Sequence, residues 1–427
     1  MQRPLKVLIN AQMIPDGKGG GTEQFVMALV HALGRLTDGD EQYIVIAHPR
    51  SPEWLNPYLG PNQKIVVAPQ PKRMLVDRVK RLAGPLWAVA RGVWHGVRSF
   101  VPRAPWGPSD PLPQSGGFYE ALGGDVIHFP YQWFIRCGLP AIYNPWDLQH
   151  VHFPEFFSKK EVAYRDALYR GACNCAHAVA TASMAVKSDL RRQYGLDAQK
   201  IFVVHCGPPT VLYGDTTDQT LREVRERFRL PDLFALFPAQ TWPHKNHLRL
   251  LEAIRLVRDR HGVRLNLVCT GTKNDHWTAI RRQIDKFELQ TQVFFLGYIS
   301  PHELRTLYRM AQFVVFPSLF EGGGFPVVEA LQEGAPVICS DIPPLREYGG
   351  DAVLAFDPHS TEDIASSLLR MSKDAELREQ LRARGKERVR IFTWERTAKA
   401  YRALYRKVAG VSLSEEDHHL LTRGGMG

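Results

Sequence analysis

The chain has 427 residues, with 54 Lys and Arg, 44 Asp and Glu, and a formal net charge of +10. This length exceeds one compact core and predicts two domains of roughly 200 residues each. The composition, 44% hydrophobic and 23% charged, is typical of a globular protein. No apolar run approaches the ~18 residues of a membrane span. The polar N-terminal segment is unlike a signal peptide, so we expect a cytoplasmic protein.

The positive charge is concentrated in one segment, residues 72–103, which holds eight Lys and Arg and one acid, Asp77. Interleaved apolar residues such as Trp87 and Trp94 would let this segment lie on an anionic membrane surface, as in a peripheral membrane protein. The alternative is a solvated insertion packed on the N-terminal domain, which Gly84-Pro85 favours because it breaks any single long helix. No nucleic-acid-binding motif accompanies the charge, so we expect no nucleic-acid partner.

The N-terminal half predicts alternating strands and helices, the pattern of a parallel sheet covered on both faces. Residues 7–10 form an apolar strand, a glycine-rich loop follows over 16–22, and 23–36 predict a helix. An insertion over about 71–117, rich in basic residues and proline, interrupts this alternation. Further strands are predicted over 43–48, 64–68, 125–129, 141–144, 178–182 and 201–205.

The glycine loop over residues 17–21 does not fit two common phosphate-binding motifs. A dinucleotide-binding G-x-G-x-x-G frame would need glycine at Thr22 or Gln24, and no acid ends the second strand to bind a ribose. The Gly-Lys-Ser/Thr ending of a Walker loop is also missing from this segment. Two interpretations remain, a flexible turn or a loop that closes over a ligand phosphate.

The C-terminal half shows the same alternation. Ser300 and Glu303 predict a capping box with Pro301 at the first helical position. Strands are predicted over 233–240, 265–271, 293–298, 313–318, 336–341 and 352–356, and helices over 247–260, 277–287, from 300 onward and over 326–333. Residues 207–232 show no strand pattern and are predicted to link the two domains.

These patterns predict an α/β fold with two Rossmann-like, doubly wound domains. The N-terminal domain would span residues 1–206 and the C-terminal domain residues 233–391. Sheets of this kind bind ligands at the carboxyl ends of their strands, so two of them in tandem would face each other across a ligand-binding cleft.

The most informative motif is a glycine loop between two acids, which runs from Glu321 through three glycines to Glu329. It places bare backbone N–H groups at a helix N-terminus, where the macrodipole favours an anion. Two acids beside an anion site suit a ligand with phosphates and hydroxyls, such as a nucleotide sugar. Lys245, after the first strand of this half, is placed to pair with a phosphate, and the alternative is a solvated lysine at a helix start.

The C-terminal half also carries a series of motifs in a fixed order. They are the acids Glu321 and Glu329, Gly334-Ala335-Pro336-Val337, Ile342-Pro343-Pro344-Leu345-Arg346-Glu347, Gly350-Asp351-Ala352 and Phe392-Thr393-Trp394-Glu395. Together they resemble the signature of the retaining glycosyltransferases of family 4, which have the GT-B architecture. The resemblance is strong over 233–405 and weaker in the N-terminal half. The segment 242–247 resembles the branch that builds bacterial surface polysaccharides, often mannosyl- or rhamnosyltransferases.

This resemblance implies a role for each conspicuous residue. Glu321 would bind the hydroxyls of the donor sugar near the reacting face, Glu329 would hold the ribose hydroxyls, and Lys245 would neutralise the leaving diphosphate. The other implied donor-binding residues are Gly20 and Gly21 for the diphosphate, Gly297 and Tyr298 for the nucleobase, and Gly322, Gly323, Gly324 and Phe325, whose backbone N–H groups would face the sugar and the diphosphate.

The sequence departs from the family in the glycine loop and at two further positions. The loop often has phenylalanine where this chain has Gly323. Gln240 stands where many members have an arginine, so one of two phosphate cations is missing or is supplied elsewhere. Trp146 occupies the place of a histidine that approaches the reacting sugar.

The polar role of that histidine passes to Asp147, His150 or His152, or the reaction does not need it. His150 and His152 are close enough in sequence to suggest a metal pair. However, loop histidines more often only form hydrogen bonds, and the family needs no bound metal. We therefore predict Asp147 and His150 as catalytic candidates, with no metal and no other cofactor.

The resemblance implies transfer of a hexose, mannose or similar, from a GDP- or UDP-sugar to a hydroxyl of a glycan or lipid-linked acceptor, with retention of the anomeric configuration. Two other interpretations remain open. One is a nucleotide-sugar epimerase or hydrolase on the same architecture. The other is a non-catalytic sugar-nucleotide-binding module, which Trp146 and Gln240 make plausible. The C-terminal segment 392–427 would carry a helix over 394–408 that returns to the N-terminal domain, as in the family.

Overall fold

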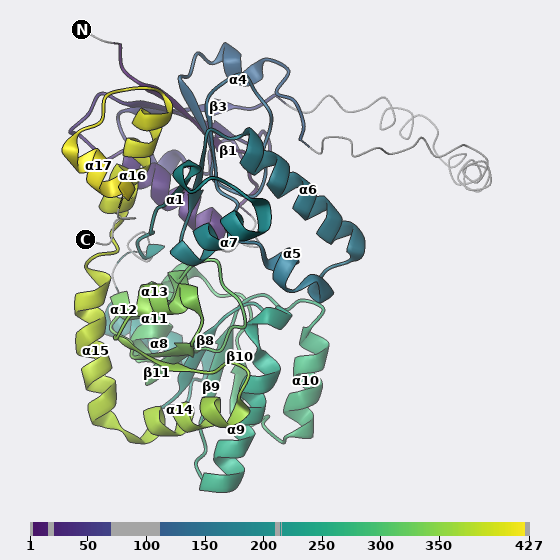
Figure 1. Cartoon of the computed structure of the whole chain (residues 1–427). Helices are drawn as coiled ribbons and strands as arrows, with labels where there is room; N and C mark the ends of the chain where they lie inside the picture. The colour runs from purple at the N-terminus through teal and green to yellow at the C-terminus, as the bar shows by residue number, and fades with distance from the viewer. Residues whose placement is uncertain (1–2, 16–20, 70–111, 210–213, 215, 423–427) are drawn as a thin grey trace, which may run out of the picture.

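The computed structural model describes residues 3–15, 21–69, 112–209, 214 and 216–422. These residues form two α/β bodies, one above the other in Figure 1, each built on a parallel sheet. All strand pairs in both sheets are parallel. The predicted fold class, with two doubly wound sheets, is confirmed.

The N-terminal sheet has seven strands in the order β3-β2-β1-β4-β5-β6-β7. The interior strand β1 aligns Val7 with Tyr43 on one side and with Val126 on the other. Because helices cover both faces, the central strands are almost wholly apolar and buried. The strands are β1 (Lys6–Ala11), β2 (Gln42–Ala47), β3 (Gln63–Val67), β4 (Val126–Phe129), β5 (Ala141–Tyr143), β6 (Ala178–Thr181) and β7 (Ile201–Val203).

Side-chain caps mark the start of two helices of this domain, α6 and α7. Ser158 and Ser183 each accept a hydrogen bond from a backbone N–H in the first turn of the following helix. Gly195 ends α7 in the left-handed conformation, with φ of 66°. The helices are α1 (Gly21–Leu33), α4 (Phe118–Ala121), α5 (Gln149–His152), α6 (Lys159–Cys175) and α7 (Met184–Tyr194), with the 3-10 turns η1 (Asn56–Tyr58), η2 (Pro154–Phe156) and η3 (Ala198–Lys200).

The C-terminal sheet has six strands in the order β10-β9-β8-β11-β12-β13. The chain moves outward from β8 to one edge and then returns to β11 on the other side of β8. The carboxyl ends of β8 and β11 therefore form a topological switch point, where doubly wound sheets bind ligands. The strands are β8 (Ala235–Pro238), β9 (Leu267–Thr270), β10 (Val293–Phe295), β11 (Phe313–Phe316), β12 (Val337–Ser340) and β13 (Val353–Phe356).

The predicted capping box is present in this domain, because Ser300 and Glu303 exchange hydrogen bonds at the start of α11. Two separate cores lie on the two faces of the sheet. The helices are α9 (His247–His261), α10 (Trp277–Lys286), α11 (Pro301–Met310), α12 (Phe325–Gln332), α13 (Pro343–Gly349), α14 (Thr361–Lys373) and α15 (Ala375–Val389), with the 3-10 turn η5 (Pro243–Lys245).

After α15 the chain returns to the upper body through α16 (Trp394–Val408) and ends with α17 (Glu415–Thr422) (Figure 1). Tyr401 and Tyr405 of α16 are fully buried in the core that α1 and β1 share. The imidazole of His128 lies 2.9 Å from the Tyr405 hydroxyl and 2.9 Å from Asn144 Oδ1. Burial lowers the pKa of His128 to about 4, so this contact is between neutral groups near pH 7.

The segment predicted as a linker, 207–232, contains a helix, α8 (Asp218–Phe228). Val224 of α8 is buried in a core of the C-terminal domain with Leu307 of α11. Thr217 begins this helix with a capping box to Thr220. The helix α8 buries few apolar residues, so its sequence is mostly polar and lacks the apolar periodicity of a core helix. The sequence analysis therefore did not predict it. The C-terminal domain therefore includes this helix.

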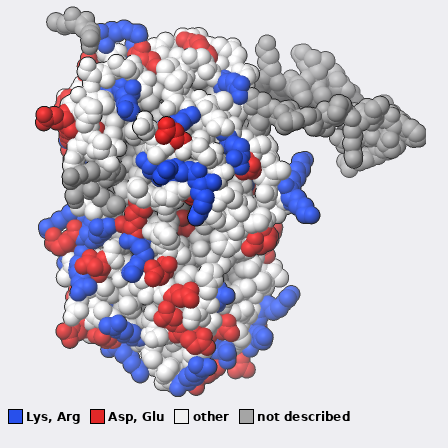
Figure 2. Space-filling model, in the orientation of Figure 1, with Lys and Arg blue, Asp and Glu red and all other residues white. Residues whose placement is uncertain are grey.

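The basic segment 72–103 and its proposed membrane contact lie outside the described residues. On the face shown in Figure 2, acidic and basic side chains of the described residues are interspersed. Among the described helices, none combines the length and the apolar character that a membrane span requires.

Candidate active site

A cavity of about 370 Å³ lies between the two domains at the switch point of the C-terminal sheet. The N-terminal domain contributes the first turns of α1, and the C-terminal domain contributes the loops after β8, β9, β10 and β11. Its lining includes Gly21, Glu23, Gln24 and Met27 from α1, and Gln240, Lys245, Gly271, Tyr298, Tyr308, Glu321, Phe325 and Glu329 from the C-terminal domain. Donor-binding candidates from distant parts of the sequence thus share one cavity.

The loop after β8 is held in a conformation that directs Lys245 to this cavity. Lys245 ends the η5 turn, and the next residue, Asn246, adopts φ of 63°. The buried Asn246 amide donates hydrogen bonds to the carbonyls of Pro317 (3.0 Å) and Pro358 (2.9 Å). These bonds tie the loop after β8 to the loop after β11. The position of Lys245 is therefore coupled to that of Glu321.

Lys245 and Glu321 form an ion pair, with Nζ 2.6 Å from Oε1. Their side chains are only 17% and 14% exposed, so the pair is shielded from most of the solvent screening that weakens surface pairs. A short charge-assisted hydrogen bond of this kind orients both groups. The pair brings together the two catalytic candidates that the sequence placed 76 positions apart.

Three consecutive glycines let the loop after Glu321 pass between the domains. A Cβ at Gly322 would lie 2.6 Å from the carbonyl oxygen of Trp146, and one at Gly324 would lie 2.4 Å from Cβ of Tyr348. The Ser183 hydroxyl donates a hydrogen bond of 2.9 Å to the Gly322 carbonyl. At Gly322 the loop therefore packs directly on the N-terminal domain, and a larger residue there would push the two domains apart. A larger residue at Gly324 would instead collide with α13 of the same domain.

We expect Gly322→Ala to lower the transfer rate about tenfold, because a shift of a few tenths of an ångström between the domains misaligns reacting groups. The measurement is kcat for sugar transfer, together with the unfolding temperature. Gly138→Ala is the matched control, because its new Cβ would make only an ordinary contact of 3.5 Å. Equal activity in both variants would contradict a tight interdomain fit at Gly322.

Glu329 lies inside the cavity wall, one turn into α12. Its side chain is buried, and the Tyr308 hydroxyl donates a hydrogen bond of 3.1 Å to Oε2. Burial raises the pKa of Glu329 to about 7, the bond from Tyr308 opposes this, and the nearby Glu333 adds to it. A carboxylate at this position would accept hydrogen bonds from ligand hydroxyls, which replace part of its lost hydration.

We expect Glu329→Gln to stabilise the protein by about 3 kcal/mol at pH 8 and to have little effect at pH 4. The pKa of Glu329 is raised from 4.5 in the unfolded chain to about 7 in the fold. The folded state therefore binds the proton more tightly, and wild-type stability is lost as pH rises from about 4.5 to 7. Calorimetric unfolding at both pH values measures this.

Glu333→Gln is the matched control for that experiment. Glu333 is buried and accepts hydrogen bonds from Arg305 (2.8 Å) and Arg309 (2.6 Å). Its neutralisation removes one side of two ion pairs and should destabilise the protein at pH 8. Destabilisation by both substitutions at pH 8 would mean that Glu329 is not held in an unfavourable ionised state.

The N-terminal candidates Asp147 and His150 occupy different environments. Asp147 lines a second cavity of about 220 Å³ with Glu321 and Gly322, and burial together with the negative Glu321 raises the pKa of Asp147. His150 is buried in the N-terminal domain, 3.3 Å from the Tyr194 hydroxyl. Burial lowers its pKa to about 4. The structure brings Asp147 to Glu321 and leaves His150 away from both cavities.

His150 lies away from the cavities because the short helix α5 turns it into the core. The same helix turns His152 toward the surface, where it pairs with Asp189 at 2.6 Å. Trp146 adopts φ of 68° and packs edge-on against Phe25 of α1, so its ring belongs to the core. Asp147 follows Trp146 directly and lines the second cavity together with Gln132 and Glu321.

The remaining donor-binding candidates line the cavity or lie beside it. The Gln240 side chain accepts a hydrogen bond of 2.8 Å from the Trp242 indole and lines the cavity without supplying a positive charge. Tyr298 is 63% exposed at the edge of the cavity, and Gly297 before it adopts φ of 77°. Gly20 lies outside the described residues.

Several residues at the site were missed by the sequence analysis. Tyr308 supports Glu329, Asn246 positions Lys245, and Ser183 holds the glycine loop. Gly271 adopts φ of 100°, and a Cβ there would lie 2.6 Å from the Ala239 carbonyl. The asparagine after Lys245 and the glycine after β9 could have indicated tight loops at the site, because both residue types tolerate positive φ. The partners of Tyr308 and Ser183 depend on the tertiary fold.

In the described part of the chain, no group of three or more His, Cys, Asp or Glu is arranged to hold a metal ion. The described cavity lining offers one Lys, three acids (Glu23, Glu321 and Glu329) and the first residues of α12, and Glu321 stands directly before the glycine loop. Such a lining suits a ligand with both phosphates and hydroxyls.

Two Rossmann-like domains that enclose this site at a switch point define a glycosyltransferase of the GT-B fold. A family model described as "Glycosyltransferase Family 4" matches residues 19–212, and one described as "Glycosyl transferases group 1" matches residues 219–388. The chain belongs to the glycosyltransferases of family 4.

Known proteins agree with this assignment. The chain is 28% identical to O-antigen chain mannosyltransferase B of Escherichia coli over 263 residues, 60% of this chain and 69% of that protein. It is 28% identical to O-antigen chain mannosyltransferase RfbU of Salmonella typhimurium over 222 residues, 52% of this chain and 58% of that protein. The structure of Anabaena Alr3699/HepE in complex with UDP and glucose superposes with a TM-score of 0.66 at 18% identity, over 94% of this chain and 100% of that one.

Proposed function

We propose that this glycosyltransferase moves a hexose, mannose or similar, from a GDP- or UDP-sugar to a hydroxyl of a glycan or lipid-linked acceptor, with retention of the anomeric configuration. The observation that carries the proposal is the Lys245–Glu321 pair beside the glycine loop, in a cavity lined by both domains. The mannosyltransferase names of its relatives favour mannose, and a UDP complex of a protein with the same fold supports a nucleotide donor.

In this proposal, the bond from the anomeric carbon to the diphosphate breaks while the acceptor oxygen attaches to the same face of that carbon, and the proton of the acceptor hydroxyl passes to the departing diphosphate. Negative charge grows on the departing diphosphate, and catalysis consists mainly of stabilising it. Lys245 and the backbone N–H groups at the start of α12 supply positive charge there. Glu321 would hold the sugar hydroxyls, and Glu329 the ribose hydroxyls. Contact between the domains would exclude water and limit hydrolysis of the donor.

The loss of the usual arginine at Gln240 makes Lys245 the central cation of this scheme. Gln240 Oε1 is occupied by the Trp242 indole N–H, so the amide can offer only its N–H groups to the ligand. These are neutral donors that can bind a phosphate oxygen without adding charge. The proposal therefore assigns most of the charge compensation among the described residues to Lys245.

A thermal-shift panel of GDP-, UDP- and dTDP-sugars tests the donor, because binding raises stability with the logarithm of ligand excess. The preferred donor should then support transfer to a saccharide with retained anomeric configuration, measured by NMR of the product. Release of nucleotide with free or isomerised sugar in the presence of acceptors would favour a hydrolase or an epimerase. Binding without turnover would favour a sugar-nucleotide-binding module.

A position at the cytoplasmic face of the membrane stays a prediction, based on the basic segment 72–103. Binding to vesicles with and without anionic lipid, compared between the full chain and a variant with neutralised basic residues in that segment, measures it. We expect anionic-vesicle binding that weakens with salt. If the full chain and the neutralised variant bind anionic vesicles equally, the segment would instead be a solvated insertion.

A further inference from the structure

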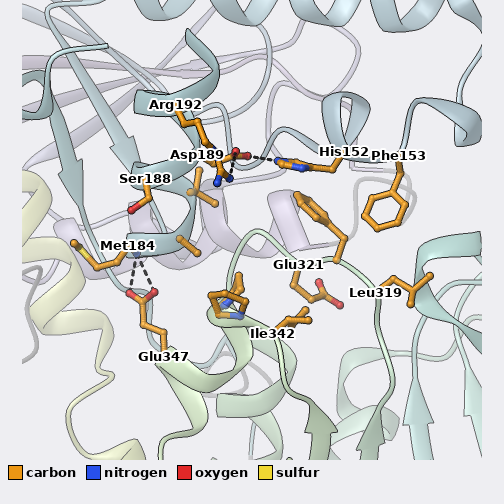
Figure 3. Close-up of a pocket in the computed structure, with 15 residues that line it drawn as sticks. His152, Phe153, Met184, Ser188, Asp189, Arg192, Leu319, Glu321, Ile342 and Glu347 are labelled. Atoms are coloured by element: carbon orange, nitrogen blue, oxygen red, sulfur yellow. Dashed lines mark hydrogen bonds and ion pairs between the residues drawn. The ribbon is translucent and has the colours of Figure 1, made fainter. Parts of the chain in front are cut away.

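A groove larger than either of the cavities at the switch point opens at Glu321, where the glycine loop begins. It has a volume of about 670 Å³, within the range of about 300–1,000 Å³ of small-molecule sites. One wall comes from α7 and the chain after α5, and the other comes from the loop after β11 and the start of α13 (Figure 3). Glu321 lines this groove and also both cavities at the switch point. The groove therefore leads to the position where the donor sugar would react.

The walls alternate apolar surface with polar groups that are held in place. Met184 is 50% exposed on the N-terminal wall, and Ile342 belongs to the wall from the other domain (Figure 3). At one end the ring of Phe320 lies 5.5 Å from the His152 ring and 5.9 Å from the Phe153 ring. These apolar and aromatic surfaces come from both domains, so the groove exists only while the domains are in contact.

The polar groups are oriented by fixed partners. Asp189 is bonded to His152 at 2.6 Å and to Arg192 at 3.3 Å. Glu347 accepts two hydrogen bonds of 2.9 Å from the Met184 backbone N–H. Both carboxylates are largely buried. Each carboxylate keeps lone pairs that can accept hydrogen bonds from the hydroxyl groups of a ligand. An ionised carboxylate cannot donate hydrogen bonds.

The charge of the groove discriminates between kinds of acceptor. Its described lining contains three acids, Asp189, Glu321 and Glu347, and one Lys or Arg, Arg192, which already pairs with Asp189. Of these acids, Glu321 pairs with Lys245, and Glu347 lies 2.6 Å from His205 Nε2. A phosphate would therefore have to displace Asp189 from the one guanidinium group of the described lining. A neutral saccharide suits the groove, because its hydroxyls donate to the carboxylates while its C–H faces pack on the apolar walls.

We propose that this groove binds the neutral sugar residues of the acceptor glycan next to the one that carries the attacking hydroxyl. The inference rests on the proposed function and makes it more specific. It assigns the enzyme an acceptor of several uncharged sugars, rather than a phosphorylated monosaccharide. The terminal sugar lies at Glu321, and the preceding sugars extend along α7 toward Ser188 and Arg192.

The test compares acceptors of increasing length on variants that fill the groove. Ser188 is exposed on α7 and lines the groove, so Ser188→Trp places a large ring in it. Arg191→Trp puts the same ring at an exposed position of the same helix outside the groove, and Ser188→Ala is the small-residue control. The acceptors are methyl α-mannoside, an α-linked mannobiose, a mannotriose and mannose 6-phosphate, each assayed with the donor identified by thermal shift.

For the wild-type enzyme we expect kcat/KM to rise at least tenfold from the monosaccharide to the trisaccharide, with mannose 6-phosphate no better than the monosaccharide. Ser188→Trp should lose this gain, while Arg191→Trp and Ser188→Ala keep it. Donor KM and the slow hydrolysis of the donor without acceptor should stay within twofold in all variants, which also shows that they are folded.

A chain-length gain that survives Ser188→Trp would overturn the inference and leave the proposed function intact. The same holds if mannose 6-phosphate is the best acceptor, or if donor hydrolysis occurs but no saccharide is glycosylated or raises the unfolding temperature. A protein that neither binds nor hydrolyses any nucleotide sugar would overturn the proposed function, and the inference with it.

Discussion

Replacing Lys245 with alanine is expected to lower kcat for sugar transfer by roughly 10²–10³-fold, equivalent to about 3–4 kcal/mol of transition-state stabilisation. The same change should weaken binding of the nucleoside diphosphate product about tenfold or more. The reason is that Lys245 is the one Lys or Arg in the described lining of the cavity, and Gln240 offers only neutral donors there. Steady-state kinetics and calorimetric titration with GDP or UDP measure the two effects.

Lys286→Ala is the control for that substitution, because Lys286 is exposed on α10, away from the cavity. It should change neither kcat nor nucleotide binding by more than twofold. Full activity of Lys245→Ala would show that another cation stabilises the leaving diphosphate, and the site assignment would then be wrong.

The closeness of Lys245 and Glu321 has a consequence for the catalytic cycle. Without ligand, the ammonium group is neutralised by the carboxylate at 2.6 Å. In the proposed function, a bound diphosphate would compete for the ammonium, and the sugar hydroxyls would compete for the carboxylate. A ligand that carries a diphosphate and a sugar together would satisfy both groups at once. We therefore expect the ion pair to favour the intact donor over either of its parts.

Much of the fold could be predicted from the sequence because the strands are short, apolar and buried on both faces. The strand β11 over Phe313–Phe316, for example, has no polar residue that would place it at a surface. The helix α8 could not be predicted in the same way, since Val224 is its only buried residue. Its place in the C-terminal domain depends on tertiary packing against α11.

The candidate site was predictable where the chemistry follows from local spacing. The glycine loop fixes Glu321 before a helix and Glu329 one turn inside it. The pairing of Lys245 with Glu321 depends on the strand order, which brings β8 next to β11. The orientation of α5 separates His150 from the cleft, and only the fold reveals it. The groove along α7 is likewise assembled from segments of both domains.

Glu321→Gln is expected to lower kcat by about 10²-fold or more. Unlike Lys245→Ala, it should not weaken nucleotide binding. The amide keeps the shape of the side chain but not the charge that would hold the sugar hydroxyls. Lys245 would then have no carboxylate at 2.6 Å, so its charge becomes fully available to a phosphate. GDP or UDP should therefore bind equally well or several-fold more tightly.

The double variant Lys245→Ala/Glu321→Gln decides whether the two groups act together. Residues in direct contact are not expected to have additive effects. If Glu321 serves the sugar and Lys245 the diphosphate of one transition state, the double variant should be hardly slower than the slower single variant. Fully multiplicative losses would mean that the groups act in separate steps. Tighter nucleotide binding by Glu321→Gln that disappears in the double variant would show that the gain came from the unpaired ammonium.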